Sequence, residues 1–265
     1  MSTPLYRQVA QALQRRIESG ELAEGARVST EDQLMEAYRA SRNTVRRALK
    51  ELAGRGLVHT LHGRGTFVSG RVSPIVITLT SDRRTGAGGG EGIAYAAEIA
   101  ARGRSPSIPE TRVEIMKAPP AVADLLRVPG DSEVISRRQR RYVDGEPWSL
   151  QTSYYPRSLA DRAPRLLSTD DIPEGTVAYL AQHGIRQAGY QDSLGWRAPE
   201  EEEARYFDLG ADGHVQVVEI NRLGFDQGKN RVRLTVTVYR ADRNRFTINV
   251  GDVPAEESLF DDAGT

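Results

Sequence analysis

The chain has 265 residues, of which 38% are hydrophobic, with 36 Lys or Arg against 36 Asp or Glu and no cysteine. This length suits two domains, and the lack of cysteine excludes disulfides and thiolate metal sites. No apolar run approaches the roughly 20 residues of a membrane span, and the first residues lack a signal-peptide core, so we expect a cytoplasmic protein without membrane contact.

The neutral total hides an uneven distribution of charge. Residues 1–70 hold 11 basic and 7 acidic residues, a balance of +4, and residues 71–265 carry the compensating −4. Six Lys or Arg side chains lie in the segment 41–68 beside a single acid. A basic head on an acidic body predicts a polyanion partner for the head alone.

Three short helices are predicted at the start of the chain. The first is indicated by apolar residues at every fourth position, namely Leu5, Val9, Leu13 and Ile17. Thr30, followed three residues later by Gln33, forms a capping box that opens a second helix. Ser41 can cap a third helix, which ends at Gly54.

The third helix carries a row of polar side chains off its apolar stripe. These are Arg42, Asn43, Arg46, Arg47 and Lys50. Two short strands around a glycine-containing turn follow, in residues 57–69. Three helices and a hairpin make the winged helix-turn-helix pattern, whose third helix enters the major groove of DNA. In the major groove, an Arg side chain can donate hydrogen bonds to guanine, and an Asn side chain can form hydrogen bonds with adenine.

The hairpin would lie against the DNA backbone or the minor groove. Gly63 lets it approach phosphates closely, and His62 and Arg64 add hydrogen-bond donors there. Taken singly, any one cation of this head could belong to an ordinary solvated surface. The cluster on the third helix favours DNA binding.

The segments "LYRQVAQALQRRIESGELAEGARV", "TEDQL", "SRNTVRRALKELAGRGLV" and "GRGTFV" closely resemble the DNA-binding domain of the GntR family of bacterial transcription regulators. The resemblance implies operator contacts from Arg42, Asn43, Thr44, Arg46, His62 and Gly63. The family usually has Pro-Ser-Glu where Ser29–Glu31 stands, and often has Arg where Asp32 stands. A phosphate or base contact from position 32 is therefore expected to be absent.

The body begins with a strand pattern, "IVITLT", and a glycine run in residues 85–92, followed by a helical segment. The glycine run could cradle an anion or form a mobile loop. Beyond it we expect a strand, a helix over 121–127, and two strands joined by a tight turn at Asp144-Gly145. A later helix, "EEEARYFDLG", precedes the strands "VQVVEINRLGF" and "RVRLTVTVYRADRNRF". Antiparallel strands with few helices predict an α+β domain.

The pieces "APPAVADLLRVPGDSEV", "YVDGEPWSLQTSYYP" and "VYRADRNRF" resemble the UTRA effector-binding domain of the HutC subfamily, which has a chorismate-lyase-like fold. The resemblance implies a small molecule that binds between the strands and shifts the DNA-binding heads. We expect a winged helix-turn-helix domain over 1–70, a linker over 71–78, a UTRA-like effector-binding and dimerisation domain over 79–251, and a disordered tail over 252–265.

The expected effector-binding residues are Arg137, Gln139, Arg141, Gln151, Ser153 and Arg233. Relatives carry Arg-x-Arg at the places of Gln139 and Arg141, and Glu at those of Gln151 and Arg233. Fewer acids beside Arg141 favour an anionic ligand. The alternative is a solvated edge strand for two or three of the four arginines between 137 and 141.

These patterns predict a repressor that binds a pseudo-palindromic operator as a homodimer and leaves it when a small anionic metabolite binds. We expect no cofactor and no enzyme activity, because the four histidines are scattered and suggest no catalytic constellation. Two alternatives stay open. The body could only dimerise, or it could keep a lyase-like activity, although fold does not carry function.

Overall fold

The computed structural model describes residues 4–54, 56–61, 65–68, 75–80, 92–209 and 215–251. The chain divides into two compact units, residues 1–73 and residues 74–265. Among the described residues, no helix is both long and apolar enough to cross a membrane.

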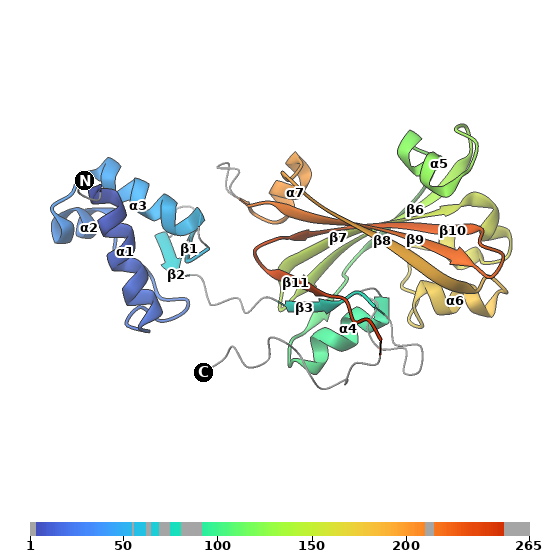
Figure 1. Cartoon of the computed structure of the whole chain (residues 1–265), viewed down its shortest axis with the longest axis horizontal. Helices are drawn as coiled ribbons and strands as arrows, with labels where there is room; N and C mark the ends of the chain where they lie inside the picture. The colour runs from blue at the N-terminus through green and yellow to red at the C-terminus, as the bar shows by residue number, and fades with distance from the viewer. Residues whose placement is uncertain are drawn as a thin grey trace. The chain divides into compact units, whose positions relative to one another are not determined.

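The first unit consists of three helices and a hairpin, as the sequence predicts (Figure 1). Its elements are α1 (Leu5–Glu18), α2 (Glu31–Tyr38), α3 (Arg42–Gly54), β1 (Val58–Leu61) and β2 (Gly65–Val68). The capping box of α2 is present, because the Thr30 hydroxyl accepts from the Gln33 amide and the Gln33 side chain accepts from the Thr30 amide. Leu5 differs from the predicted apolar face, since it is 45% exposed.

The small core of this unit joins all of its elements. The three helices contribute Val9, Leu13, Leu34, Val45 and Leu52, and the hairpin contributes Val58 and Val68, all of them buried. Burying apolar side chains stabilises a fold by about 1.5–3 kcal/mol for each large one. This packing fixes one face of α3 inward, so its polar residues must face solvent.

The second unit is built on one large antiparallel sheet. Its strands are β4 (Pro106–Ser107), β5 (Thr111–Lys117), β6 (Glu133–Val143), β7 (Glu146–Pro156), β8 (Gln187–Arg197), β9 (Val217–Asp226) and β10 (Arg231–Arg240). They lie in the order β4-β6-β7-β10-β9-β8, and β5 also pairs with β6. The turn between β6 and β7 uses positive φ at Asp144 and Gly145, which matches the predicted tight turn.

The remaining elements of the second unit are short and lie on the two faces of this sheet. The helices are α4 (Gly92–Ala101), α5 (Pro120–Leu126), η1 (Arg157–Asp161), η2 (Pro164–Leu167), α6 (Thr176–Gln182) and α7 (Glu201–Tyr206). A separate parallel pair is formed by β3 (Ile75–Thr78) and β11 (Asn244–Thr247). The expected α+β fold with an antiparallel sheet is therefore present.

The two faces of the sheet differ in chemistry. One face is apolar and packs against α5 and α7 through residues such as Leu234, Leu150 and Val238. The opposite face is covered at one end by α6 and the η helices, which pack on Ile135 and Tyr155. Figure 1 shows α5 and α7 on one side of the sheet, and α6, β3, β11 and α4 on the other.

The structure differs from the sequence expectations at two strands, β3 and β8. The predicted linker over 71–78 is wrong in its second half, because Ile75–Thr78 is strand β3, which pairs with β11 through its backbone and buries its apolar side chains. Strand β8 was not predicted, since its polar and glycine-containing sequence lacks a clear alternation. The tail over 252–265 and most of the glycine run lie outside the described residues.

Candidate DNA interface and effector face

The N-terminus of α3 presents the predicted DNA-reading residues to solvent. Arg42, Asn43, Arg46, Arg47 and Lys50 are all exposed, and Thr44 is partly exposed. The Ser41 hydroxyl accepts from the Thr44 amide at 3.2 Å and so caps the helix. The first turn of α3 is thus capped, with its polar side chains on the solvent side.

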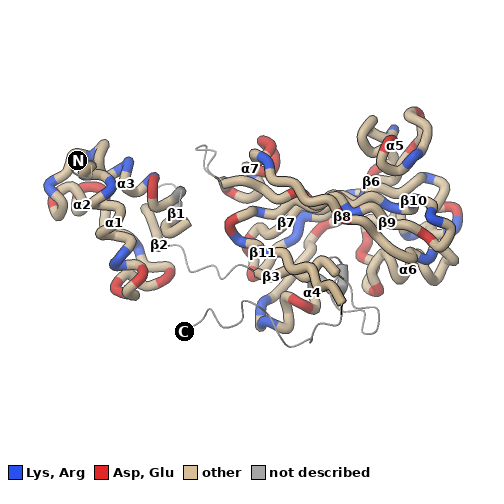
Figure 2. The backbone as a smooth tube through the Cα atoms, in the orientation of Figure 1, with Lys and Arg blue, Asp and Glu red and all other residues tan. Residues whose placement is uncertain are grey.

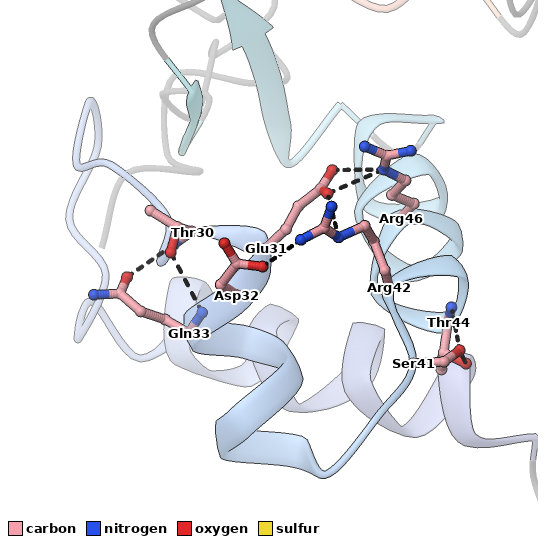
Figure 3. Close-up of polar contacts among 8 residues, drawn as sticks. All are labelled: Thr30, Glu31, Asp32, Gln33, Ser41, Arg42, Thr44 and Arg46. Carbon is pink, nitrogen blue, oxygen red and sulfur yellow. Dashed lines mark hydrogen bonds and ion pairs between the residues drawn. The ribbon is translucent and has the colours of Figure 1, made fainter.

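Two acids from the start of α2 contact the arginines of α3 (Figure 3). Asp32 accepts from Arg42 at 2.6 Å, and Glu31 accepts from Arg46 at 2.9 Å and 3.0 Å. Glu31 also lies 3.9 Å from Arg42. The hydrogen bond and the charge of Glu31 raise the pKa of the Arg46 guanidinium. These contacts were not predicted. The sequence signal for them was the two consecutive acids at the start of the helix that precedes the basic helix.

Arg47 has a different environment from its neighbours. Its guanidinium lies over the ring of Tyr6 from α1, 3.9 Å from the ring centroid. Such cation–π contacts contribute about 0.5–1 kcal/mol at exposed sites. Arg47 therefore links α3 to α1 as well as presenting a charge.

The predicted contacts of the wing fall on three residues. His62, Gly63 and Arg64 lie outside the described residues. The hairpin strands that flank them do pair, with Leu61 opposite Gly65 and Val58 opposite Val68. Figure 2 shows the acidic positions of α2 and the basic positions of α3 within this unit.

The polar face of the large sheet brings together most of the predicted effector residues. Opposite residues in an antiparallel pair share a face, and the register places Gln139 opposite Gln151 and Arg141 opposite Ser149. Thr237 lies opposite Gln151, and Thr235 opposite Ser153. Arg141, Gln151, Ser153 and Arg233 are all buried.

Hydroxyls and amides on this face bond to one another. Ser153 and Thr235 share a hydrogen bond at 3.0 Å, and Thr237 donates to Gln151 at 3.4 Å. Two guanidiniums donate to neutral amides, Arg141 to Gln139 at 3.5 Å and Arg233 to Gln187 at 3.1 Å.

Another buried arginine on this face was missed by sequence reasoning. Arg222 of β9 lies opposite Thr235 and opposite Asp192 of β8. It forms two hydrogen bonds with the Asp192 carboxylate, at 2.7 Å and 2.5 Å, and stacks over the Tyr190 ring at 3.9 Å. Glu219 and Asn221 also lie in β9, so a charged residue in this strand does not by itself indicate a buried position.

Arg137 lies on the same face but has a structural role. Its guanidinium donates to the carbonyl oxygens of Arg165, Leu166, Ser168 and Asp170. Burial lowers its pKa from the ordinary value. Because these bonds hold the η2 turn and the residues after it against the sheet, we leave Arg137 out of the proposed effector site.

Arg138 and Arg140 point to the other face of β6. Both contact Glu202 of α7, at 2.9 Å and 3.4 Å. Burial of Glu202 raises its pKa, but the hydrogen bonds and positive charges of these arginines outweigh burial. The pKa of Glu202 therefore lies below the ordinary value. They line a shallow depression with Glu110 and Arg112, away from the polar face.

A winged helix-turn-helix unit followed by an α+β unit with a polar, arginine-bearing sheet face defines a DNA-binding regulator with a ligand-binding domain. Comparisons with known proteins agree. Residues 5–68 match the model of the gntR family of bacterial regulatory proteins, and residues 101–245 match that of the UTRA domain. The chain belongs to the GntR family of transcriptional regulators, in the group that carries a UTRA domain.

Relatives match over nearly the whole length. The chain is 26% identical to the transcriptional repressor NagR of Bacillus subtilis, over 92% of this chain and 93% of the relative. It is 24% identical to the transcriptional regulator GgaR of Escherichia coli K12, over 91% and 89%. The crystal structure of PhnF from Mycobacterium smegmatis superposes with a TM-score of 0.56 at 26% identity, covering 92% of this chain and 99% of that one.

Proposed function

We propose that this regulator is a repressor, and that a small anionic metabolite bound on the polar face of the second unit releases it from DNA. The observation that carries the proposal is the gathering of Arg141, Arg222 and Arg233 on one buried sheet face. Each of these side chains is at most 4% exposed. The proposed activity is binding rather than catalysis.

The donor chemistry of this face supports an anion. A guanidinium can only donate hydrogen bonds, whereas carboxylates and phosphates can only accept when fully ionised. Charge-assisted bonds between them are about twice as strong as neutral ones. Gln151, Ser153 and Thr237 add neutral groups that can orient the remainder of a ligand. The carboxylate of Asp192 is already held by Arg222, so it offers little attraction to a cation.

Release from DNA requires the ligand to prefer one of two states. A ligand that binds both the DNA-bound and the released state equally shifts nothing. Couplings of about 1–3 kcal/mol are typical of allosteric proteins. We propose a homodimer as the working form, because a single recognition helix reads one half-site and two-fold symmetric proteins read pseudo-palindromes. Such a protein would act in the cytoplasm, beside the chromosome.

The test is a thermal-shift screen of the full chain against inorganic phosphate, sugar phosphates, and di- and tricarboxylates. Each compound is paired with its uncharged analogue, such as the free sugar or the methyl ester. We expect one anion to raise the melting temperature while its analogue does not. The same anion should then displace the protein from a duplex selected out of a randomised pool.

Other outcomes point to other functions. Stabilisation by an uncharged analogue alone would contradict an anionic effector. If no compound stabilises the protein while it still selects a DNA sequence, the second unit would serve dimerisation only. Turnover of a stabilising compound would indicate enzyme activity.

A further inference from the structure

The end of the recognition helix that must approach DNA has two acids beside its two arginines. In Figure 3 the side chains of Glu31 and Asp32 point toward Arg42 and Arg46. Asp32 and Arg42 are joined at 2.6 Å although their side chains are 76% and 55% exposed. Exposed ion pairs contribute little to stability. A contribution to the stability of the fold therefore does not explain this ion pair.

The pair does have a direct consequence for DNA binding. Non-specific affinity comes almost entirely from Lys and Arg side chains that neutralise phosphates. A phosphate that approaches Arg42 must compete with the carboxylate of Asp32 and is repelled by it. The two acids cancel the charge of the two arginines, so this end of α3 attracts the DNA backbone weakly.

A base edge meets the same pair differently. Guanine offers two acceptors to an arginine, and cytosine offers an amino group that a carboxylate can accept from. Arg42 and Asp32 could thus remain in contact while facing a G·C pair. The carboxylate penalises a phosphate contact and tolerates a base contact.

We propose that Asp32 is a specificity-determining residue of DNA binding, which suppresses phosphate contacts by Arg42 and directs this arginine to a base edge. The proposal rests on the DNA-reading function of α3. We assign this role to Asp32 rather than to Glu31, because Glu31 contacts both Arg42 and Arg46 and its substitution would change the surroundings of both arginines. The side chain of Asp32 also takes no part in the capping box of Thr30 and Gln33, so its substitution leaves that box in place.

The test compares Asp32→Asn with wild type in the full chain. Wild type first selects a duplex from a randomised pool, and both proteins are then titrated with this duplex and with a scrambled duplex of the same composition at several salt concentrations. We expect Asp32→Asn to bind the scrambled duplex several-fold more tightly, with a salt dependence steeper by about one unit of slope. The ratio of the affinity for the selected duplex to the affinity for the scrambled duplex should therefore be smaller than in wild type.

Glu36→Gln is the matched control, because it makes the same charge change on the exposed surface of the same helix. It should leave the preference unchanged. A second control is the double variant with Arg42→Ala, in which Asp32→Asn should have no further effect. The proposal is overturned if Asp32→Asn behaves like Glu36→Gln, or if its effect persists without Arg42. Failure of wild type to select any sequence would overturn the DNA-reading function and this proposal together.

Discussion

The guanidinium of Arg222 donates to the main-chain oxygen of Leu79 at 3.0 Å, although 143 positions separate the two residues. Leu79 follows strand β3 directly, and β3 starts two residues after the end of the first unit. The same oxygen accepts from the Tyr190 hydroxyl at 2.6 Å. A ligand that draws Arg222 toward itself would therefore loosen the anchoring of the strand that follows the DNA-binding unit.

Tyr190→Phe tests this anchoring without disturbing the Arg222–Asp192 ion pair. Removing one hydroxyl that bonds to a carbonyl should lower the free energy of unfolding of the second unit by about 1 kcal/mol. It should also weaken the effect of the effector on DNA binding. Thermal denaturation and effector titration of the operator complex measure the two quantities. Tyr142→Phe is the control, and equal behaviour of the two variants would argue against the anchoring role.

Arg42→Ala should weaken binding to the selected duplex by about 1–3 kcal/mol and relax the base preference at one position of each half-site. Arg46→Ala should act in the same direction. Lys50→Ala, farther along α3, should weaken binding evenly across sequences and flatten the salt dependence by about one unit of slope. Fluorescence anisotropy with single-base variants of the duplex measures both effects. A loss of base preference in Lys50→Ala alone would reverse these assignments.

Sequence patterns predicted the first unit better than the second. The helices and caps of residues 1–54 depend on local spacing and on residues such as Thr30 and Ser41, which act within one turn. The contacts of Arg42 with Asp32, and of Arg222 with Leu79, depend on tertiary packing across 10 and 143 positions. Strand β8 was missed because an edge strand with exposed polar residues lacks the alternation that marks a half-buried one.

The residues proposed to bind the effector show the same limit of sequence-based prediction. Alternation along β6 correctly separates Arg137, Gln139 and Arg141 from Arg138 and Arg140. It does not reveal that Arg137 is occupied by carbonyl groups of the η2 turn, because that turn follows far along the chain. The alternation of side chains along a strand therefore predicts which residues share a face, but it does not predict the contacts that each of these side chains makes.

Arg141→Ala should leave binding to the selected duplex nearly unchanged and abolish the response to the effector. Arg141 is 1% exposed on the polar face, where a guanidinium can donate to an anion. Arg233→Glu should weaken binding of the same ligand, because it places a negative charge beside an anion. Titration of the operator complex with the stabilising anion is the measurement. Arg138→Ala, on the opposite face, is the control, and a normal response in Arg141→Ala would place the effector elsewhere.

The protein should be a homodimer both free and on DNA. The apolar side chains of the first unit pack largely in that unit's own small core, with Leu5 exposed, so we expect the second unit to supply most of the dimer contacts. Light scattering at micromolar concentration, on the full chain with and without the selected duplex, measures the mass. A monomer under both conditions would contradict the two-fold symmetric mode of binding.

The last prediction concerns Glu203 of α7, whose carboxylate accepts from Arg197 at 2.7 Å through both oxygens and from the Glu200 amide at 2.7 Å. Burial alone would raise its pKa, but the hydrogen bond and charge of Arg197 outweigh burial and hold the pKa below the ordinary value. A group with a depressed pKa stabilises the fold above its unfolded pKa, and this contribution is lost as the pH falls through the folded pKa.

Glu203→Gln should therefore cost about 2 kcal/mol of unfolding free energy near neutral pH, since it removes one charged partner of a mostly buried pair. The difference between wild type and variant should shrink as the pH falls from neutral through the lowered pKa of Glu203, where the wild-type carboxylate also becomes neutral. Urea denaturation of the full chain across this pH range measures the difference. Glu201→Gln, whose side chain is 88% exposed in the same helix, should change stability little at any pH. A cost for Glu203→Gln that is independent of pH would mean that packing, rather than the charge, holds α7 on the sheet.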